Sequence, residues 1–327
     1  MIAKELLFGS NLAIDIHEKK GTGFGWACHG GHLEVAKWLW QLDQNIDIHA
    51  FDENAFRYAC HGGHLEVAKW LWQLDQNIDI HVKSEDAFRY ACHGGHLEVA
   101  KWLWQLDQNI DIHVKSEDAF RYACRCGHFE VAKWLWQLDQ NIDINALKEE
   151  AFRSACCNRH LEVAKWLFQL DNNINIHSID EYAFRFACNG GHLEVAKWLW
   201  QLNRNIDIHV LKEYAFRSAC GRGHLEVAKW LWQLNQNIDI HVLNEDAFRS
   251  ACYNGHLEVA KWLFQLDNNI NIHSKYEYAF RFACNGGHLE VAKWLWKLNQ
   301  NIDIHAFDEG AFRYACYGGH LEVAKWL

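Results

Sequence analysis

The sequence lacks a run of basic residues, a long apolar stretch and a linker of biased composition. The formal net charge is −10, and charged residues are spread evenly over 327 positions. This excludes wrapping of a nucleic-acid phosphate backbone and binding to an anionic membrane surface. No apolar stretch reaches the length of a membrane-spanning helix, and residues 1–8 lack the features of a signal peptide. Because half of the residues are hydrophobic, the chain can bury a continuous core.

One word, Gly-His-Leu-Glu-Val-Ala-Lys-Trp with single substitutions, recurs ten times, and its histidine returns every 32 residues from His32 to His320. A fixed period without a composition shift predicts one tandem array over residues 1–327. Residues 1–17 align with the second half of a repeat, and residues from about 306 to 327 form a truncated repeat. We therefore expect the array to begin and end within a repeat.

Two short helices are predicted in each repeat. In the first, Ala55, Phe56, Ala59 and Cys60 fall on one face at i, i+4 spacing. Glu53 and Arg57 are also four residues apart, which predicts a helix-surface ion pair worth about 0.3–0.5 kcal/mol.

The second helix follows a glycine turn. Gly62 and Gly63 permit positive φ, and apolar residues cover most of the segment 65–74. The helix ends at Asp75, a residue type that tolerates the left-handed conformation found just past helix ends. An alternating arm over 78–80 leads to a polar tip. We expect this second helix to be mostly buried.

Ten of the twelve cysteines occupy one repeat position, from Cys28 to Cys316. Neighbouring packed helices lie roughly 8–10 Å apart, too far for a disulfide between equivalent cysteines. The pattern predicts small buried thiols and an intracellular, reducing compartment.

The order of helix, glycine turn, Gly-His-Leu-Glu-Val, second helix and Asn-Ile-Asp-Ile arm resembles the ankyrin repeat over practically the entire chain. The repeats are one residue shorter than the usual length, and the Thr-Pro-Leu-His opening is replaced, as at residues 54–57. The chain contains no proline. The resemblance implies an all-α, ankyrin-like helical solenoid of about ten 32-residue helix-turn-helix repeats with short β-hairpin-like loops. Two tryptophans per second helix, such as Trp70 and Trp72, resemble ankyrin arrays encoded by large DNA viruses.

The histidines and cysteines are compatible with several chemistries. The Gly-His histidines are predicted to be structural, at the start of the second helix. The arm histidines, from His17 to His305, are predicted to be solvated loop residues, with a ladder that charges near acids such as Asp47 and Asp79 as the alternative. Cys124, Cys126 and His128 are too few for a metal site, which needs about four converging ligands. The tryptophans are predicted to be core residues. No catalytic set stands out, because every reactive group is duplicated along the array, so we expect no enzyme activity, cofactor or metal.

Variation between repeats indicates where function resides, because the frame barely changes while the tip, the position of Tyr58 and the turn position of His61 do. In ankyrin arrays, tips and first helices line the concave surface that binds proteins. The candidate protein-binding residues are Asp52, Asn54, Tyr58, His61, Ser84, Asp86, Tyr90, His93, Tyr122, Arg125, Asp180, Tyr182, Phe186, Asn189, Tyr214, Arg222, Asn244, Tyr253, Tyr276, Phe282, Asn285, Tyr314 and Tyr317.

The sequence predicts a non-catalytic scaffold, monomeric, that binds a protein partner and neither nucleic acid nor membrane. Three alternatives stay open: a passive spacer, a substrate-recruiting adaptor within a longer, ubiquitin-ligase-linked viral protein, and a metal or pH sensor. Residues 61–92 and 93–124 are identical, so part of the similarity between repeats reflects recent copying, which is compatible with a partner that is itself repetitive or with a spacer. Arg159 occupies a turn position that is glycine in the other nine repeats, which predicts a local weak point.

Overall fold

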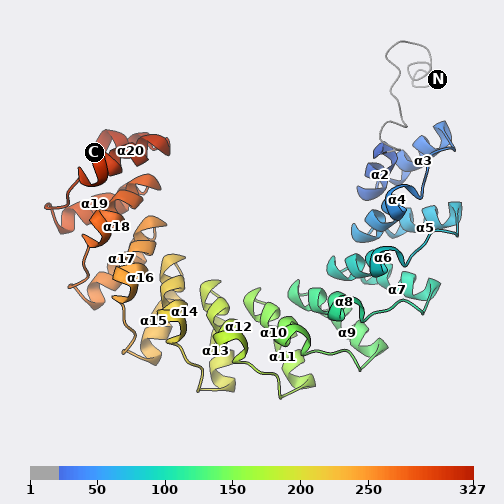
Figure 1. The fold of residues 1–327 in the computed structure, drawn as a ribbon, viewed down its shortest axis with the longest axis horizontal. Coiled ribbons are helices and arrows are strands. Elements are labelled where there is room, and N and C mark those ends of the chain that lie inside the picture. Colours follow the sequence, from blue (N-terminus) through green and yellow to red (C-terminus); the bar gives the residue numbers. More distant parts are fainter. Residues whose placement is uncertain (1–21) are drawn as a thin grey trace, which may run out of the picture. The chain divides into compact units, whose positions relative to one another are not determined.

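The computed structural model describes residues 22–327, and every regular element in that range is an α-helix (Figure 1). The first helices of the repeats are α2 (Thr22–His29), α4 (Ala50–His61), α6 (Val82–His93), α8 (Val114–Arg125), α10 (Ala146–Cys157), α12 (Ser178–Asn189), α14 (Val210–Gly221), α16 (Val242–Tyr253), α18 (Ser274–Asn285) and α20 (Ala306–Tyr317). The second helices are α3 (Leu33–Leu42), α5 (Leu65–Leu74), α7 (Leu97–Leu106), α9 (Phe129–Leu138), α11 (Leu161–Leu170), α13 (Leu193–Leu202), α15 (Leu225–Leu234), α17 (Leu257–Leu266), α19 (Leu289–Leu298) and α21 (Leu321–Trp326). The predicted helix-turn-helix repeat is confirmed.

The described chain divides into two compact halves. The N-terminal half comprises residues up to 155 together with 162–171, and the C-terminal half comprises 156–161 and 172–327. Within each half, successive first helices pack side by side, as α4 does with α6 and α14 with α16, and first helices such as α4 and α14 contact the second helices of their own repeats, α5 and α15. No helix in residues 22–327 is both long enough and apolar enough to cross a membrane.

The core of each repeat lies between the two helices. Phe56 is buried together with its neighbours on the predicted face, Ala59 and Cys60. Its ring lies 6.5 Å from that of Trp72 in the same repeat and 6.0 Å from that of Trp102 in the next. The prediction that the tryptophans are core residues is only partly right, because their rings contact the buried phenylalanines but are themselves half-buried, and Trp26 and Trp38 are exposed. The same alternation of rings joins successive repeats within each half.

The tip that opens each first helix from α4 onward is a left-handed turn of three residues. Phe51, Asp52 and Glu53 have φ of 56°, 57° and 59°, and right-handed helix follows. Each such residue costs about 1–2 kcal/mol because Cβ crowds the following carbonyl. The buried Arg57 stabilises the turn, since its Nε donates to the Asp52 carbonyl at 2.6 Å and Nη2 donates to the Phe51 carbonyl at 3.1 Å.

The predicted ion pair between Glu53 and Arg57 is wrong, because the left-handed turn separates the two side chains. Glu53 instead accepts from His49 Nδ1 at 2.8 Å and from the Asp79 backbone N–H at 3.3 Å. Arg57 donates forward to Asp86 of the next repeat at 2.5 Å.

The predicted left-handed end of the second helix is also wrong. Asp75 is extended, with φ −149° and ψ 116°, and its carboxylate accepts the Asn77 N–H at 2.8 Å. Asp79 forms a second side-chain turn by accepting the His81 N–H at 2.9 Å. These two turns shape the arm. Residues 22–327 contain no strands, so the predicted β-hairpin-like loop is wrong. The alternation within the arm is confirmed, because Ile78 is buried and Asp79 is exposed.

In the turn between the two helices, only the second position has positive φ. Gly62 has φ −78°, whereas Gly63 has φ 75° and a Cβ there would lie 2.3 Å from the His96 ring of the next repeat. In seven repeats the Gly-His histidine packs in this way on the turn glycine of the preceding repeat. His64 Nε2 also donates to the His29 carbonyl at 3.0 Å. The structural role predicted for these histidines is therefore confirmed.

Arg159 stands at this second position with φ 70°. We expect Arg159→Gly to raise the free energy of unfolding by about 1–2 kcal/mol, because it relieves a left-handed non-glycine residue. Arg222→Gly is the matched control, since Arg222 lies at the first turn position with φ −100°. Thermal and urea unfolding measure both variants. Equal effects of the two substitutions would contradict the assignment of strain to Arg159.

Candidate interaction surface

The structure places most candidate residues at the surface and one of them inside. Exposed are Asp52, Tyr58, His61, Ser84, Tyr90, Arg125, Asp180, Arg222, Asn244, Tyr253, Tyr276 and Tyr317. Half-buried are Asn54, His93, Tyr122, Tyr182, Phe186, Asn189, Tyr214, Phe282, Asn285 and Tyr314. Asp86 is buried, at 7% exposure.

In the N-terminal half, the candidate rings form a ladder that runs from repeat to repeat. We call it the His–Tyr ladder, and its members in order are Trp26, His29, Tyr58, His61, Tyr90, His93 and Tyr122. Successive ring centroids lie between 4.2 Å, for His93 and Tyr122, and 6.4 Å, for Tyr58 and His61. The Arg125 guanidinium lies 5.3 Å from the Tyr122 ring at the ladder's end. Burial lowers the pKa of His61, helped by the neighbouring His29 and His93, so this ring is uncharged at neutral pH.

In the C-terminal half, the rings gather in two clusters. Tyr182 stacks on Phe186 at 4.2 Å, and Phe186 contacts Tyr214 of the next repeat at 5.9 Å. In the second cluster, Phe282 contacts Tyr253, Tyr278 and Tyr314, at 5.5 Å, 4.1 Å and 5.6 Å respectively. Phe186, Phe282, Tyr314 and Tyr253 stand at ladder positions, whereas Tyr182, Tyr214 and Tyr278 stand at the repeat position of Asp86.

Asp86 is a correction to the predicted surface. Its carboxylate accepts from Arg57 of the preceding repeat at 2.5 Å and from Arg89 of its own repeat at 2.7 Å. An equivalent bond joins Arg89 to Asp118 at 2.6 Å, while Arg249 meets the Tyr278 ring at 4.7 Å instead. The residue at this position therefore varies with the side chain that contacts the buried arginine. Asp86 takes part in that ion pair inside the protein.

The arm histidines link repeats, contrary to the prediction that they are solvated loop residues. His81 Nδ1 lies 2.9 Å from Glu85 of its own tip, and Nε2 lies 3.2 Å from Asp107, where the next second helix ends. The ladder near acids that was the alternative is present, but the acids are these two and not Asp47 or Asp79. Hydrogen bonding to Glu85, and then to Asp107, raises the pKa of His81. His17 lies outside the described residues.

Two kinds of joint occur because the residue at the end of the second helix differs. Aspartate faces the histidine in the pairs His49–Asp75, His81–Asp107, His113–Asp139 and His241–Asp267. Asparagine donates to the histidine Nε2 in the pairs His177–Asn203, His209–Asn235 and His273–Asn299. Only the first kind brings two carboxylates to one imidazole.

The cysteines behave as predicted except near the last helix. Cys60 and its equivalents from Cys28 to Cys284 are buried and free, and burial raises the pKa of the Cys28 thiol to about 12. Cys316 is exposed, because no further repeat covers it in the structure, and Cys126 is exposed at the turn, apart from the buried Cys124. Among residues 22–327, no group of three or more histidine, cysteine or acidic side chains is placed to hold a metal ion.

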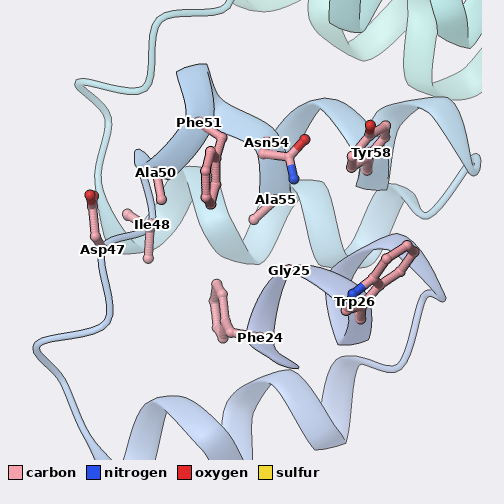
Figure 2. A pocket seen from close by; sticks show the side chains of 10 residues that line it. All are labelled: Phe24, Gly25, Trp26, Asp47, Ile48, Ala50, Phe51, Asn54, Ala55 and Tyr58. Carbon is pink, nitrogen blue, oxygen red and sulfur yellow. The ribbon is translucent and has the colours of Figure 1, made fainter. Parts of the chain in front are cut away.

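A cavity of about 200 Å³ lies between α2 and α4 (Figure 2). The rings of Phe24, Trp26, Phe51 and Tyr58 line it, together with Asn54. It opens beside the tips and first helices that carry the candidate residues.

Comparison with known proteins identifies the repeat. The family model described as ankyrin repeats, in three copies, matches residues 1–84, 74–148, 152–244, 184–276 and 248–327. The chain belongs to the ankyrin repeat family. Such repeats generally serve as protein-interaction scaffolds. No curated protein sequence matches this ankyrin chain. Among solved structures, it is similar to the crystal structure of the human ASB11 ankyrin repeat domain, with 20% identity, a TM-score of 0.43, and coverage of 56% of this chain and 84% of that chain.

Sequence reasoning missed three parts of this ankyrin surface: His29 and Trp26 in the ladder, Tyr278, and the residues around Gly25. One signal was readable, because Gly25 stands where the other nine repeats carry arginine. The ring contacts were not readable, since they depend on the packing of neighbouring first helices.

The two kinds of arm joint predict a difference in pH dependence. A raised histidine pKa contributes stability that is fully present below pH 6.5, the ordinary value, and is lost as the pH rises through the folded-state pKa. We expect the triple variant Asn203→Asp, Asn235→Asp and Asn299→Asp to enlarge the drop in melting temperature between pH 6 and pH 8 by a few degrees. Replacing Asp75, Asp107 and Asp139 with asparagine is expected to shrink the drop.

The matched control places the same three charges at exposed arm positions that do not face histidine, through Asn205→Asp, Asn237→Asp and Asn301→Asp. This control is expected to leave the drop unchanged. Thermal unfolding followed by circular dichroism measures it for all three variants. If the drop in melting temperature between pH 6 and pH 8 changes equally in the first variant and the control, the added negative charge is responsible and the contact with histidine is not.

Proposed function

We propose that this ankyrin array binds a protein partner through the surface formed by its first helices and tips. The observation that supports the proposal is the His–Tyr ladder, which presents exposed and half-buried rings from Trp26 to Tyr122 without interruption. Aromatic residues are enriched among those that dominate binding energy at protein interfaces. Apolar surface of this kind on a folded protein marks interaction sites.

The tips extend the same surface. Phe51 is 51% exposed, and Leu147 stands at the equivalent position with 53% exposure. In the C-terminal half, Ile179, Leu211 and Leu243 are exposed in successive repeats. The rigid left-handed turn holds each of these side chains in place, so little conformational entropy is lost when a partner covers them.

The ladder can be tested without harming the core, because the chain itself carries serine at the Tyr58 position in three repeats, as Ser154, Ser218 and Ser250. We expect the variant Tyr58→Ser, Tyr90→Ser, Tyr122→Ser to bind the partner at least about tenfold more weakly, since truncating interface anchors typically costs 1–2 kcal/mol or more each. The partner is identified by crosslinking and mass spectrometry, and the dissociation constant is then measured with the purified protein.

The control variant replaces exposed acids of the second helices, through Glu66→Gln, Glu98→Gln and Glu130→Gln. It is expected to keep wild-type affinity. A partner that loses affinity with the control and not with the ladder variant would place the interface on the second helices. Capture of the same set of proteins by all three chains, with equal affinity, would favour a passive spacer.

A further inference from the structure

The cavity between α2 and α4 exists because one side chain is missing. Arginine occupies the equivalent position in nine repeats, at Arg57, Arg89, Arg121, Arg153, Arg185, Arg217, Arg249, Arg281 and Arg313, and Gly25 replaces it in the first. A Cβ built on Gly25 would meet nothing within 4 Å. The space that an arginine stem occupies in later repeats is open here.

The last such joint, where α18 packs on α20, shows how a guanidinium lies against the equivalents of the residues that line the cavity. Residues 305–316 are identical to residues 49–60 except that Gly310 replaces Asn54. In that joint, the Arg281 guanidinium lies 4.4 Å from the Phe307 ring, which is the equivalent of Phe51. It also lies 5.6 Å from Phe282, the equivalent of Trp26. The cavity therefore has the aromatic walls of an occupied guanidinium site.

Figure 2 shows the arrangement of these walls. The rings of Phe24 and Phe51 lie to one side of Gly25, those of Trp26 and Tyr58 lie to the other, and the Asn54 amide lies between the two pairs. Among residues 22–327, no lysine or arginine lines the cavity, whereas Asp47 does. Ring faces attract cations, and arginine stacks on them more often than lysine does.

The residue that accepts a hydrogen bond from the arginine of the preceding repeat also has a polar equivalent beside the cavity. Asp86 accepts from Arg57 at 2.5 Å, and Asn54 holds the corresponding position in the first joint, where no arginine precedes it. A carboxylate at Asn54 would lack the first of the two arginines that Asp86 has. The other acceptors used by Arg57 are tip carbonyls, whose counterparts at residues 19 and 20 lie outside the described residues.

We propose that this cavity binds an arginine side chain of the protein partner, which takes the place that the array's own arginine takes in later repeats. The inference rests on the proposed function and names the chemistry of the partner. The partner's guanidinium stacks between Phe51 and Trp26 and donates a hydrogen bond toward Asn54.

The first experiment uses a minimal probe, N-acetyl-arginine N-methylamide, titrated into the full chain and followed by saturation-transfer NMR of the probe. Ligand signals are used because 18 tryptophans would mask a change at Trp26. The citrulline counterpart, which keeps the shape without the charge, is expected to bind about tenfold more weakly, as is the lysine counterpart, since both lose the stacked planar cation.

Three variants locate the probe. Gly25→Arg fills the cavity as the other repeats do, and is expected to abolish binding. Gly25→Ala leaves the space open and is expected to keep binding, which controls for loss of glycine in the helix. Asn54→Asp supplies the carboxylate found at Asp86 and is expected to tighten binding several-fold at low salt.

Equal binding of the arginine and citrulline probes, or binding that survives Gly25→Arg, would overturn the inference, as would absence of binding to the wild-type chain. The outcome is separable from the proposed function. A partner whose affinity falls with the Tyr→Ser ladder variant and is unchanged by Gly25→Arg would support the interface and overturn the arginine site.

Discussion

The structure depends on one arginine that recurs in nine of the repeats and is buried in seven of them. Three consecutive left-handed residues open each first helix from α4 onward, and such a turn persists only where its surroundings determine it fully. The Arg89 guanidinium supplies that determination, because it donates to the Ser84 and Lys83 carbonyls of the turn and to the Asp86 and Asp118 carboxylates. A planar fork with fixed donors suits this task better than a lysine ammonium, which carries a point charge. The same side chain therefore shapes a tip and joins it to the next repeat.

The arginine distinguishes repeat positions that vary for a structural reason from positions whose variation is available for function. The position of Asp86 varies because it must complement an arginine, either by a carboxylate or by a ring such as Tyr278. The positions of Tyr58 and His61 vary at the outer edge of the first helices, where their rings contact each other and water. Where the arginine is absent, at Gly25, its site opens to the surface beside those rings. The proposed binding surface and the cavity both lie where successive first helices pack side by side.

The arms add a second connection between repeats. A histidine such as His81 joins its own tip to the end of the next second helix, and aspartate or asparagine there decides whether the joint holds an imidazole between two carboxylates or accepts an amide hydrogen bond. The conserved Gly-His histidine makes a third connection at the turn, where the left-handed glycine lets its ring approach the preceding repeat. These polar links lie around an apolar core and fix the register of one repeat on the next.

The sequence by itself determined the family, the two helices and the core face of each repeat, because these follow from a 32-residue period and from helical spacing of apolar residues such as Phe56 and Ala59. It also marked the positions of the ladder, since repeats within one chain can be compared. Only the tertiary structure decided the partners of the charged residues. Glu53 and Arg57 look paired at helical spacing, yet the left-handed turn sends one to His49 and the other to Asp86. Positive φ at non-glycine residues leaves no local signature, because a folded arginine side chain of the same repeat stabilises it. Contacts between neighbouring repeats define the ladder, the joints and the cavity.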